Sequence, residues 1–139
     1  MPDDHFTAPM GHLLPVHEEI RQTQNAHLKA WNEGDAETYV RYVARDLIGF
    51  DVTGDLADHA RPYASLVALY AAGYKPTFQY RDRVLRVYGD TVATTAYLVG
   101  DMHQPDGSVI EGVFRYSEVR VKMDGVWKLV QYHLSPLNV

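Results

Sequence analysis

The sequence predicts an α+β fold in which N-terminal helices pack on a strongly curved antiparallel sheet. Helical periodicity fills the first half of the chain, and period-two alternation fills the second half. Short hairpin sequences such as Asp124-Gly125 join the alternating segments, which indicates antiparallel neighbours. Helices followed by an antiparallel meander are typical of this class.

The first helix is predicted to begin at Pro15 and to end at Gly34. Its apolar stripe includes Ile20 and Trp31, and His27 falls on the same stripe. Asp35 follows directly in an N-cap position and starts a second helix. Because the join has almost no loop, the two helices must turn sharply against each other.

The remaining elements follow from breaks in the pattern. The second helix is predicted over residues 36–45, a short strand over 47–52 and a third helix over 61–73. Gly54 breaks the chain after the short strand. Four long strands complete the sheet, over residues 78–88, 91–102, 109–123 and 126–134.

A two-residue turn at Asp124-Gly125 would pair Tyr116 with His133. We therefore expect the last two strands to divide their side chains between two faces. One face holds Phe114, Tyr116, Glu118, Arg120, Trp127, Leu129, Gln131 and His133; the other holds Val113, Arg115, Ser117, Val119, Val121, Val130 and Tyr132. Neither face is cleanly polar, so helices should cover one and a second subunit the other, which predicts a homodimer.

Length and composition set the domain organisation. The 139 residues are 46% hydrophobic and 22% charged, as in one globular domain, which we place at residues 15–139. Residues 1–14 lack a hydrophobic period and contain Pro2, Pro9 and Gly11. We expect a flexible N-terminal arm there, or an arm laid on a partner subunit.

Several classes of function are disfavoured. The absence of cysteine excludes disulfides, thiolate metal sites and a cysteine nucleophile. A net charge of -5 argues against a nucleic-acid surface, and no apolar run approaches the ~18 residues of a membrane span. We therefore expect a cytoplasmic protein with no cofactor, no metal site and neither nucleic acid nor membrane as a partner.

Asp51 is the first candidate for chemistry. It ends the short strand between Phe50 and Val52, and strand ends of this kind open into pockets. Apolar surroundings raise the pKa of a carboxyl group, so we expect the candidate carboxyls to titrate above their ordinary values and Asp51 to act as a base near neutral pH. The alternative is an aspartate that caps a turn.

Two histidines are further candidates. His27 lies on the apolar stripe and is expected to point inward, where a neutral imidazole donates a hydrogen bond or shuttles a proton. His133 is expected beside Glu118, Tyr116 and Gln131 on one inner patch. The alternatives are a core histidine bonded to a backbone carbonyl, and a purely structural polar network.

The chain carries 10 Tyr, 4 Phe and 2 Trp, which favours an aromatic-lined pocket for a small hydrophobic molecule. Core and interface packing is the alternative explanation for this aromatic content.

Three segments carry a resemblance to a known family: WNEGDAETYVRYVARDLIGFD, VYGDTVATTAYLV and VKMDGVWKLVQYHLSPLN. With them, residues 15–139 resemble the nuclear transport factor 2-like superfamily. The nearest branches look like the SnoaL-like polyketide cyclases and the association domain of calcium/calmodulin-dependent kinase II. The resemblance implies a cone-shaped fold, with a bent sheet wrapped round helices and a pocket at the open end.

The resemblance also implies roles for individual residues. Aligned on the ketosteroid isomerases, Asp51 falls at the general base, His27 at the oxyanion-hole tyrosine and Glu118 near the protonated aspartate. Aligned on the kinase association domain, Tyr39 matches a pocket tyrosine. That domain's pocket arginines are replaced by Val99 and Glu118, so the cavity is not expected to select a carboxylate.

These observations predict a cofactor-independent enzyme or accessory protein of polyketide-like biosynthesis that performs acid/base isomerisation, cyclisation or dehydration. The predicted catalytic residues are Asp51, His27, Glu118 and His133. The predicted ligand-binding residues are Tyr39, Tyr97, Val99, Tyr116, Trp127 and Gln131. The alternative is a non-catalytic ligand-binding or oligomerisation module of the kinase association-domain type.

Overall fold

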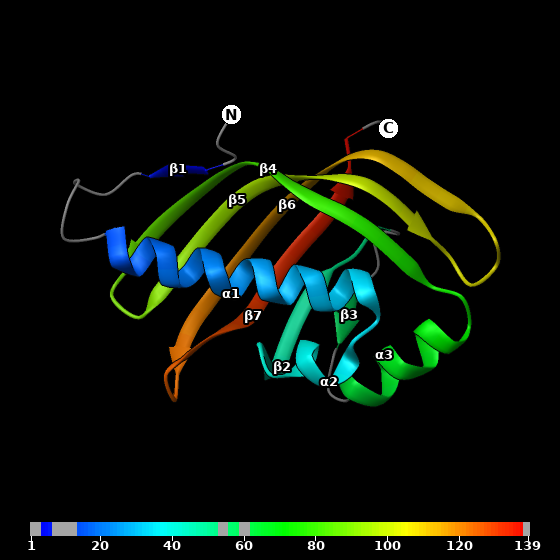
Figure 1. Cartoon of the computed structure of the whole chain (residues 1–139), viewed down its shortest axis with the longest axis horizontal. Coiled ribbons are helices and arrows are strands. Elements are labelled where there is room, and N and C mark those ends of the chain that lie inside the picture. Colours follow the sequence, from blue (N-terminus) through cyan, green and yellow to red (C-terminus); the bar gives the residue numbers. More distant parts are fainter. Residues whose placement is uncertain (1–3, 7–13, 53–55, 59–61, 138–139) are drawn as a thin grey trace.

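A strongly bent sheet wraps around one long helix in the computed structural model, which describes residues 4–6, 14–52, 56–58 and 62–137 (Figure 1). The helices are α1 (Leu14–Glu33), α2 (Ala36–Val40) and α3 (Pro62–Ala71). The strands are β1 (Asp4–Phe6), β2 (Val43–Phe50), β3 (Leu56–Asp58), β4 (Lys75–Tyr88), β5 (Thr91–His103), β6 (Val109–Met123) and β7 (Val126–Pro136). The described strands form one sheet in the order β1-β4-β5-β6-β7-β2-β3.

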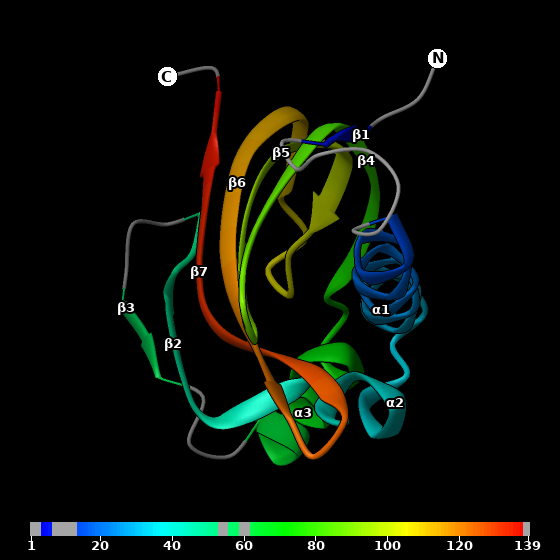
Figure 2. The ribbon, with the colours of Figure 1, turned by 90° about the vertical axis from the view of Figure 1, so that its left-hand side faces the viewer.

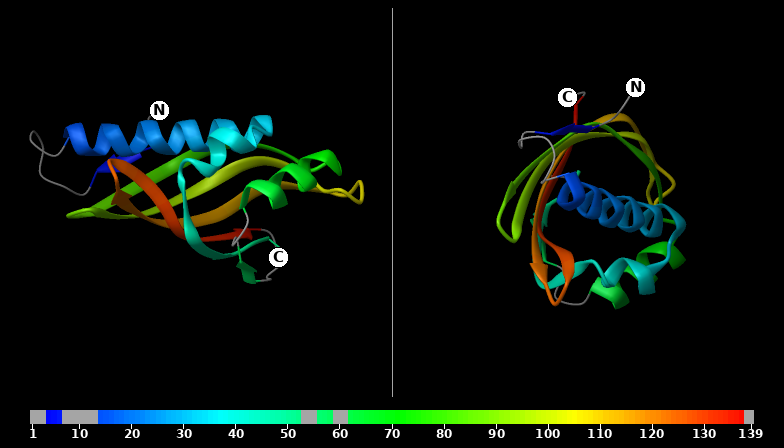
Figure 3. Two further views of the ribbon diagram at one scale, coloured as in Figure 1. Left: turned by 90° about the horizontal axis from the view of Figure 1, so that it is seen from below. Right: turned by 60° about the vertical axis from the view of Figure 1, so that its left-hand side comes forward.

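The predicted α+β class with a curved, mainly antiparallel sheet is confirmed. Strands β4 to β7 form an antiparallel meander, and β2 adds to β7 in parallel. Figures 2 and 3 show α1 on the concave side of the sheet, which curves around it. Helices α2 and α3 lie together near the C-terminal end of α1 (Figure 1).

Local sequence explains how α1 ends. Gly34 follows its last residue with a φ of +72°, a conformation that glycine adopts without strain. The Asp35 carboxylate then accepts a hydrogen bond from the backbone N–H of Thr38 at 3.1 Å and caps α2. The Asn32 side chain bonds both the N–H and the C=O of Phe78, each at 2.9 Å, and so fastens α1 to β4.

The second helix is shorter than the sequence predicts. It was expected over residues 36–45, but α2 ends at Val40 and β2 already begins at Val43. The backbone N–H of Leu129 bonds to the carbonyl of Tyr42 at 2.7 Å, and Val43 pairs with Leu129 in the parallel β2–β7 ladder. The pairing of Val43, a β-branched residue, with strand β7 therefore outweighs the helical pattern of residues 41–45.

The last hairpin forms at the predicted turn. Asp124 and Gly125 have φ angles of 52° and 80°, the positive pair that a type I′ turn requires. Strand β6 covers 109–123 as predicted, whereas β4 begins three residues before the expected start at 78. Strands β5 and β7 continue past the expected ends at 102 and 134, to His103 and Pro136.

A β-bulge in β7 corrects the predicted faces. Arg120 pairs with Leu129 as expected, but the next pair is Val119 with Gln131, so one residue of β7 is inserted between them. Because a one-residue slip exchanges the faces of a strand, Tyr132 turns to the concave side. The prediction that Gln131 and His133 share a face with Glu118 is wrong: Val119 pairs with Gln131, Ser117 pairs with His133, and both β7 side chains are exposed.

Two short strands were not expected. Strand β1 pairs in parallel with β4 and lies within the segment predicted as a flexible arm. The rest of that arm, residues 1–3 and 7–13, lies outside the described residues. Strand β3 pairs with the end of β2, and the predicted break at Gly54 also lies outside the described residues.

Candidate functional site

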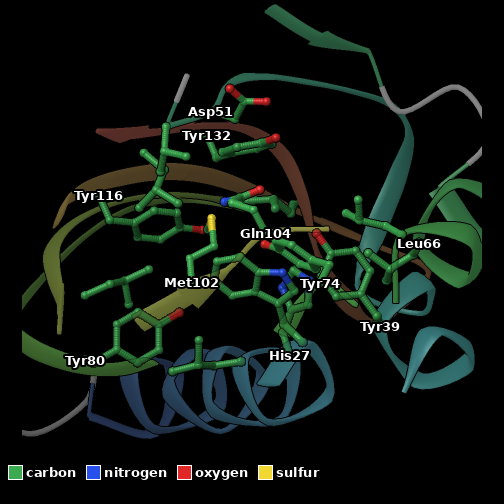
Figure 4. A pocket seen from close by; sticks show the side chains of 17 residues that line it. His27, Tyr39, Asp51, Leu66, Tyr74, Tyr80, Met102, Gln104, Tyr116 and Tyr132 are labelled. Carbon is green, nitrogen blue, oxygen red and sulfur yellow. The ribbon is translucent and has the colours of Figure 1, made fainter. Parts of the chain in front are cut away.

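A cavity of about 260 Å³ lies between the concave side of the sheet and the helices at the C-terminal end of α1 (Figure 4). Leucines, Val52 and Met102 form the aliphatic part of its lining. The aromatic lining consists of Trp31, Tyr39, Tyr74, Tyr80, Tyr116 and Tyr132. Besides these aromatic residues, the polar lining side chains are His27, Asp51 and Gln104. Apolar walls with few polar groups are typical of a small-molecule site.

His27 is placed in the cavity wall by α1, with 6% of its surface exposed. Its Nδ1 lies 2.7 Å from Nη2 of Arg120. Its Nε2 is buried and has no hydrogen-bond partner among the described residues. Burial and then the charge of Arg120 hold the pKa of His27 well below its usual value, so the imidazole is neutral near pH 7.

Asp51 follows the last residue of β2 and lines the same cavity, half-buried. Figure 4 shows Asp51 beside Tyr132, on the side of the lining opposite His27, with its carboxylate directed away from the other labelled residues in this view. Burial raises the pKa of Tyr132, and the nearby Tyr39 and Asp51 raise it further. Asp51 and His27 both line this one cavity, and their catalytic roles remain predictions.

Glu118 lies behind the cavity wall rather than in it. Its carboxylate accepts hydrogen bonds from Tyr116 at 2.7 Å and from Gln24 at 3.1 Å, and it forms a buried ion pair with Arg120. Burial acts to raise the pKa of Glu118, but the charge and hydrogen bonds of Arg120, with those of Tyr116 and Gln24, lower it. The expectation of a raised carboxyl pKa is therefore wrong for Glu118, which is ionised.

Tyr39 and Tyr116 keep their protons. Burial raises the pKa of Tyr39 to about 12, with Arg120 opposing this shift and Glu118 adding to it. Burial and the adjacent Glu118 carboxylate raise the pKa of Tyr116 well above its usual value. Both residues were predicted to bind ligand, and both line the cavity.

Trp127 was predicted to bind ligand but belongs to a different region. It packs with Ile20, Leu85 and Val92 in a cluster outside the cavity lining. Its indole Nε1–H donates to Glu19 at 3.1 Å. This tryptophan therefore stabilises the packing of α1 on the sheet, and its predicted place in the pocket is wrong.

Four more predicted residues lie away from the cavity. On β5 the buried positions are Ala96 and Leu98, so Tyr97 and Val99 lie on the other face, where the Arg81 guanidinium lies 4.9 Å from the Tyr97 ring centroid. The bulge in β7 places Gln131 and His133 on that face as well. Their predicted places in the site are wrong.

Sequence reasoning missed part of the lining. Tyr80 lies on the same face of β4 as Phe78, and Met102 lies on the same face of β5 as Leu98. The alternation of side chains along a strand is therefore sufficient to predict both. Tyr132 was hidden by the bulge. Arg120 was placed on the correct face but given no role, although a charged side chain on a buried face requires a partner.

Two further findings concern metals and membranes. Within the described ranges, no group of three or more His, Cys, Asp or Glu residues is arranged to hold a metal ion. None of the described helices has the length and apolar character needed to cross a membrane.

Solved structures share the fold. An NTF2-like protein from Cytophaga hutchinsonii superposes with a TM-score of 0.76 over 87% of this chain and 98% of its own, at 20% identity. A proposed dehydratase of the NTF2-like family from Streptomyces avermitilis gives 0.74 over 90% and 98%, at 18% identity. A ketosteroid isomerase-like protein from Erwinia carotovora atroseptica gives 0.70 over 94% and 100%, at 16% identity.

At these identities the structural likeness shows the fold alone. The search of curated proteins gives no match. The SnoaL-like domain, by contrast, matches residues 20–138, which include the whole of the cavity lining. The expected resemblance is confirmed, and the chain belongs to the SnoaL-like domain family within the nuclear transport factor 2-like fold.

Proposed function

We propose that this SnoaL-like protein is a cofactor-independent enzyme that isomerises, cyclises or dehydrates a small apolar molecule by acid/base chemistry. The observation that carries the proposal is the placement of Asp51 and His27 on opposite walls of one aromatic cavity. A ligand in this cavity is bordered by both residues, and the proposal requires the Asp51 carboxylate to turn toward it.

The chemistry follows from these two groups. The Asp51 carboxylate takes a proton from a carbon or a hydroxyl group of the bound molecule. His27 stabilises the negative charge that develops on a conjugated oxygen, and the aromatic walls keep water away from it. Return of the proton from Asp51 to another carbon is an isomerisation. Attack of the carbanion on a carbonyl carbon of the same molecule, with the proton of Asp51 passing to that carbonyl's oxygen, is a cyclisation. Loss of a β-hydroxyl group, which takes the proton of Asp51 and leaves as water, is a dehydration.

The size of the cavity limits the substrate. Its volume of about 260 Å³ lies below the roughly 300–1,000 Å³ of pockets that enclose drug-sized ligands. A substrate with one or two rings therefore fits better than an extended polycycle. We propose a role in the biosynthesis of such small, polyketide-like molecules, either as the enzyme or as an accessory protein.

Proton exchange tests the proposal without knowledge of the substrate. A panel of small apolar ketones is incubated with the protein in D₂O, and deuterium incorporation is followed by mass spectrometry. Asp51→Asn keeps the shape of the side chain and removes the base, so exchange should fall by roughly 100-fold or more while ligand affinity stays nearly unchanged. Exchange should also survive a metal chelator.

Asp46→Asn is the matched control, since Asp46 is an exposed aspartate of β2 outside the cavity lining. Its exchange rate should equal that of the wild type. If the Asp51→Asn variant incorporated deuterium at the rate of the wild type, Asp51 could not be the base. Tight binding of panel members with no exchange by the wild type would favour the alternative, a non-catalytic binding module.

The outer face of the sheet supports a second proposal, a homodimer. Ile48 and Phe50 are 47% and 48% exposed, and they pair with Gln131 and His133 on this face. Val119 lies on the same face, half-buried in the single chain. An antiparallel sheet with apolar residues on both faces requires a cover on each.

Light scattering tests the dimer. The wild type is expected to be dimeric at micromolar concentration, and Val119→Glu should give a monomer because it places a charge in the interface. Val67→Glu, at an exposed position of α3, is the control and should remain dimeric. A monomeric wild type would contradict the proposal.

A further inference from the structure

We propose that Arg120 is a positioning residue that fixes neutral His27 with its proton on Nε2, and that the inner wall of the cavity is therefore a subsite for an uncharged oxygen acceptor such as a ketone. This inference deepens the proposed function and relies on it for the use of the cavity as the ligand site. Arg120 itself lies outside the cavity lining and acts on the ligand site only through His27.

The tautomer follows from the contact between the two side chains. Nη2 of Arg120 lies 2.7 Å from Nδ1 of His27. A guanidinium group only donates hydrogen bonds, so Nδ1 must be the acceptor. A neutral imidazole carries one ring proton, and that proton is then on Nε2.

Arg120 itself is held in place. It is completely buried and forms an ion pair with Glu118, with a bond from Nη2 to Oε1 at 3.0 Å. Its Nη1 donates to the backbone carbonyl of Trp127 at 3.3 Å. Tyr116 and Gln24 fix the Glu118 carboxylate from two other directions. The guanidinium therefore presents Nη2 to His27 in one defined geometry.

The opposite nitrogen of the ring has no such partner. Nε2 points away from Arg120, and it is buried without a hydrogen bond to any described residue. A buried donor without an acceptor is unfavourable, and a ligand oxygen relieves that cost. His27 lines the cavity but Nε2 itself is covered, so a ligand oxygen bonds to Nε2–H only after a small shift of the side chains that cover this nitrogen.

The charges around the cavity favour a ligand with an uncharged oxygen over a ligand with a carboxylate. Arg120 and Glu118 neutralise each other behind the wall, and His27 is neutral. Asp51 is the formally charged member of the described lining. A carboxylate ligand would find no cation in the lining and would be repelled by Asp51, whereas a ketone would accept from Nε2–H without an uncompensated charge.

Nitrogen NMR tests the tautomer directly. Long-range ¹H–¹⁵N correlation on the ¹⁵N-labelled protein distinguishes a protonated from an unprotonated ring nitrogen, and His27→Gln assigns the signals. We expect protonated Nε2 and unprotonated Nδ1 for His27 at pH 7. A proton on Nδ1, or on both nitrogens, would overturn the proposal.

The double variant Glu118→Gln/Arg120→Met tests the role of Arg120. It removes both charges together, so no unpaired charge stays buried, and the new amide still accepts from Tyr116. We expect His27 to lose its single tautomer. Arg83→Met removes a buried arginine that bonds Gln24 and Asn25 instead, and it should leave His27 as in the wild type. An unchanged tautomer in a folded double variant would overturn the role of Arg120.

Three probes of similar shape test the subsite even if the double variant does not fold. Acetophenone carries the acceptor oxygen, isopropylbenzene lacks it, and benzoate is anionic. Acetophenone should shift the His27 Nε2–H resonance and bind several-fold to about tenfold more tightly than either of the others. Preference for benzoate would overturn the subsite. If Asp51→Asn did not slow deuterium exchange while His27 still carried its proton on Nε2, only the catalytic proposal would be refuted.

Discussion

At one end of the concave face Trp127 packs against Ile20, Leu85 and Val92, whereas at the other end Leu69 and Tyr74 border an open cavity. We call these regions the packed end and the pocket end. Both are built from alternating inward side chains of the same strands. At the packed end these side chains meet the N-terminal part of α1, and at the pocket end they face the C-terminal part of α1, α2 and α3 across the cavity (Figures 1 and 4).

The polar network of Gln24, Glu118 and Arg120 separates the two ends. Its charges pair internally, and it holds one nitrogen of His27 while the other nitrogen stays buried without a partner among the described residues. Apolar composition alone therefore does not distinguish a core from a binding site. The distinction depends on whether the facing element is near enough for the side chains to interdigitate.

The largest expected difference between the two ends is in the cost of truncation. Trp127→Ala should reduce the free energy of unfolding by about 3–5 kcal/mol, because it removes a buried ring and leaves a hole. Leu69→Ala should cost less than about 1 kcal/mol, since Leu69 is 37% exposed and already borders open space. Urea unfolding of both variants measures the difference, and equal losses would contradict this account of the two ends.

A smaller effect should appear as a pH dependence of stability. The pKa of His27 is lowered in the folded state, so the unfolded chain binds the proton first as the pH falls below about 6.5. Stability should therefore decrease below that pH, by at most about 1.4 kcal/mol per pH unit from this group. Arg120, Tyr39 and Tyr42 face the ring. Burial raises the pKa of Tyr39 to about 12, so Tyr39 stays neutral in this range.

Urea unfolding at pH 7.0 and 5.5 checks this dependence. His27→Gln should flatten the difference between the two pH values. His133→Gln replaces an exposed histidine of the outer face and should preserve that difference. The ionised Glu118 adds its own loss only at lower pH, because its pKa is lowered from 4.5. A steeper or unchanged profile for His27→Gln would contradict the assignment.

The smallest expected effect is the loss of stability when α2, which borders the pocket end, loses its N-cap. Asp35→Ala removes the N-cap of this five-residue helix and should cost about 1 kcal/mol. Asp35→Asn keeps an acceptor for the Thr38 N–H and should cost only a few tenths of a kcal/mol. Thermal unfolding compares the two. Loss of ligand binding in the alanine variant with stability unchanged would mean that Asp35 acts on the site rather than on the helix.

Features that depend on neighbouring residues could be predicted from the amino-acid sequence. Helical period placed His27 on the inner stripe, Gly34 and Asp35 marked the junction of two helices, and Asp124-Gly125 specified a hairpin turn. Strand alternation placed Tyr116 and Glu118 on the concave side. Each of these rests on backbone preference or on side-chain period, which act over a few residues.

Features that depend on distant partners could not be predicted from local sequence and are seen only in the folded chain. The bulge in β7 forms where the strand must follow both β6 and β2, and it exchanges Tyr132 for His133 at the cavity. Strand β2 replaced the end of the predicted helix because β7 offered hydrogen bonds to it. The tautomer of His27 depends on Arg120, which lies 93 positions away in sequence. No local pattern encodes such contacts, because they form only when the bent sheet closes around the helix.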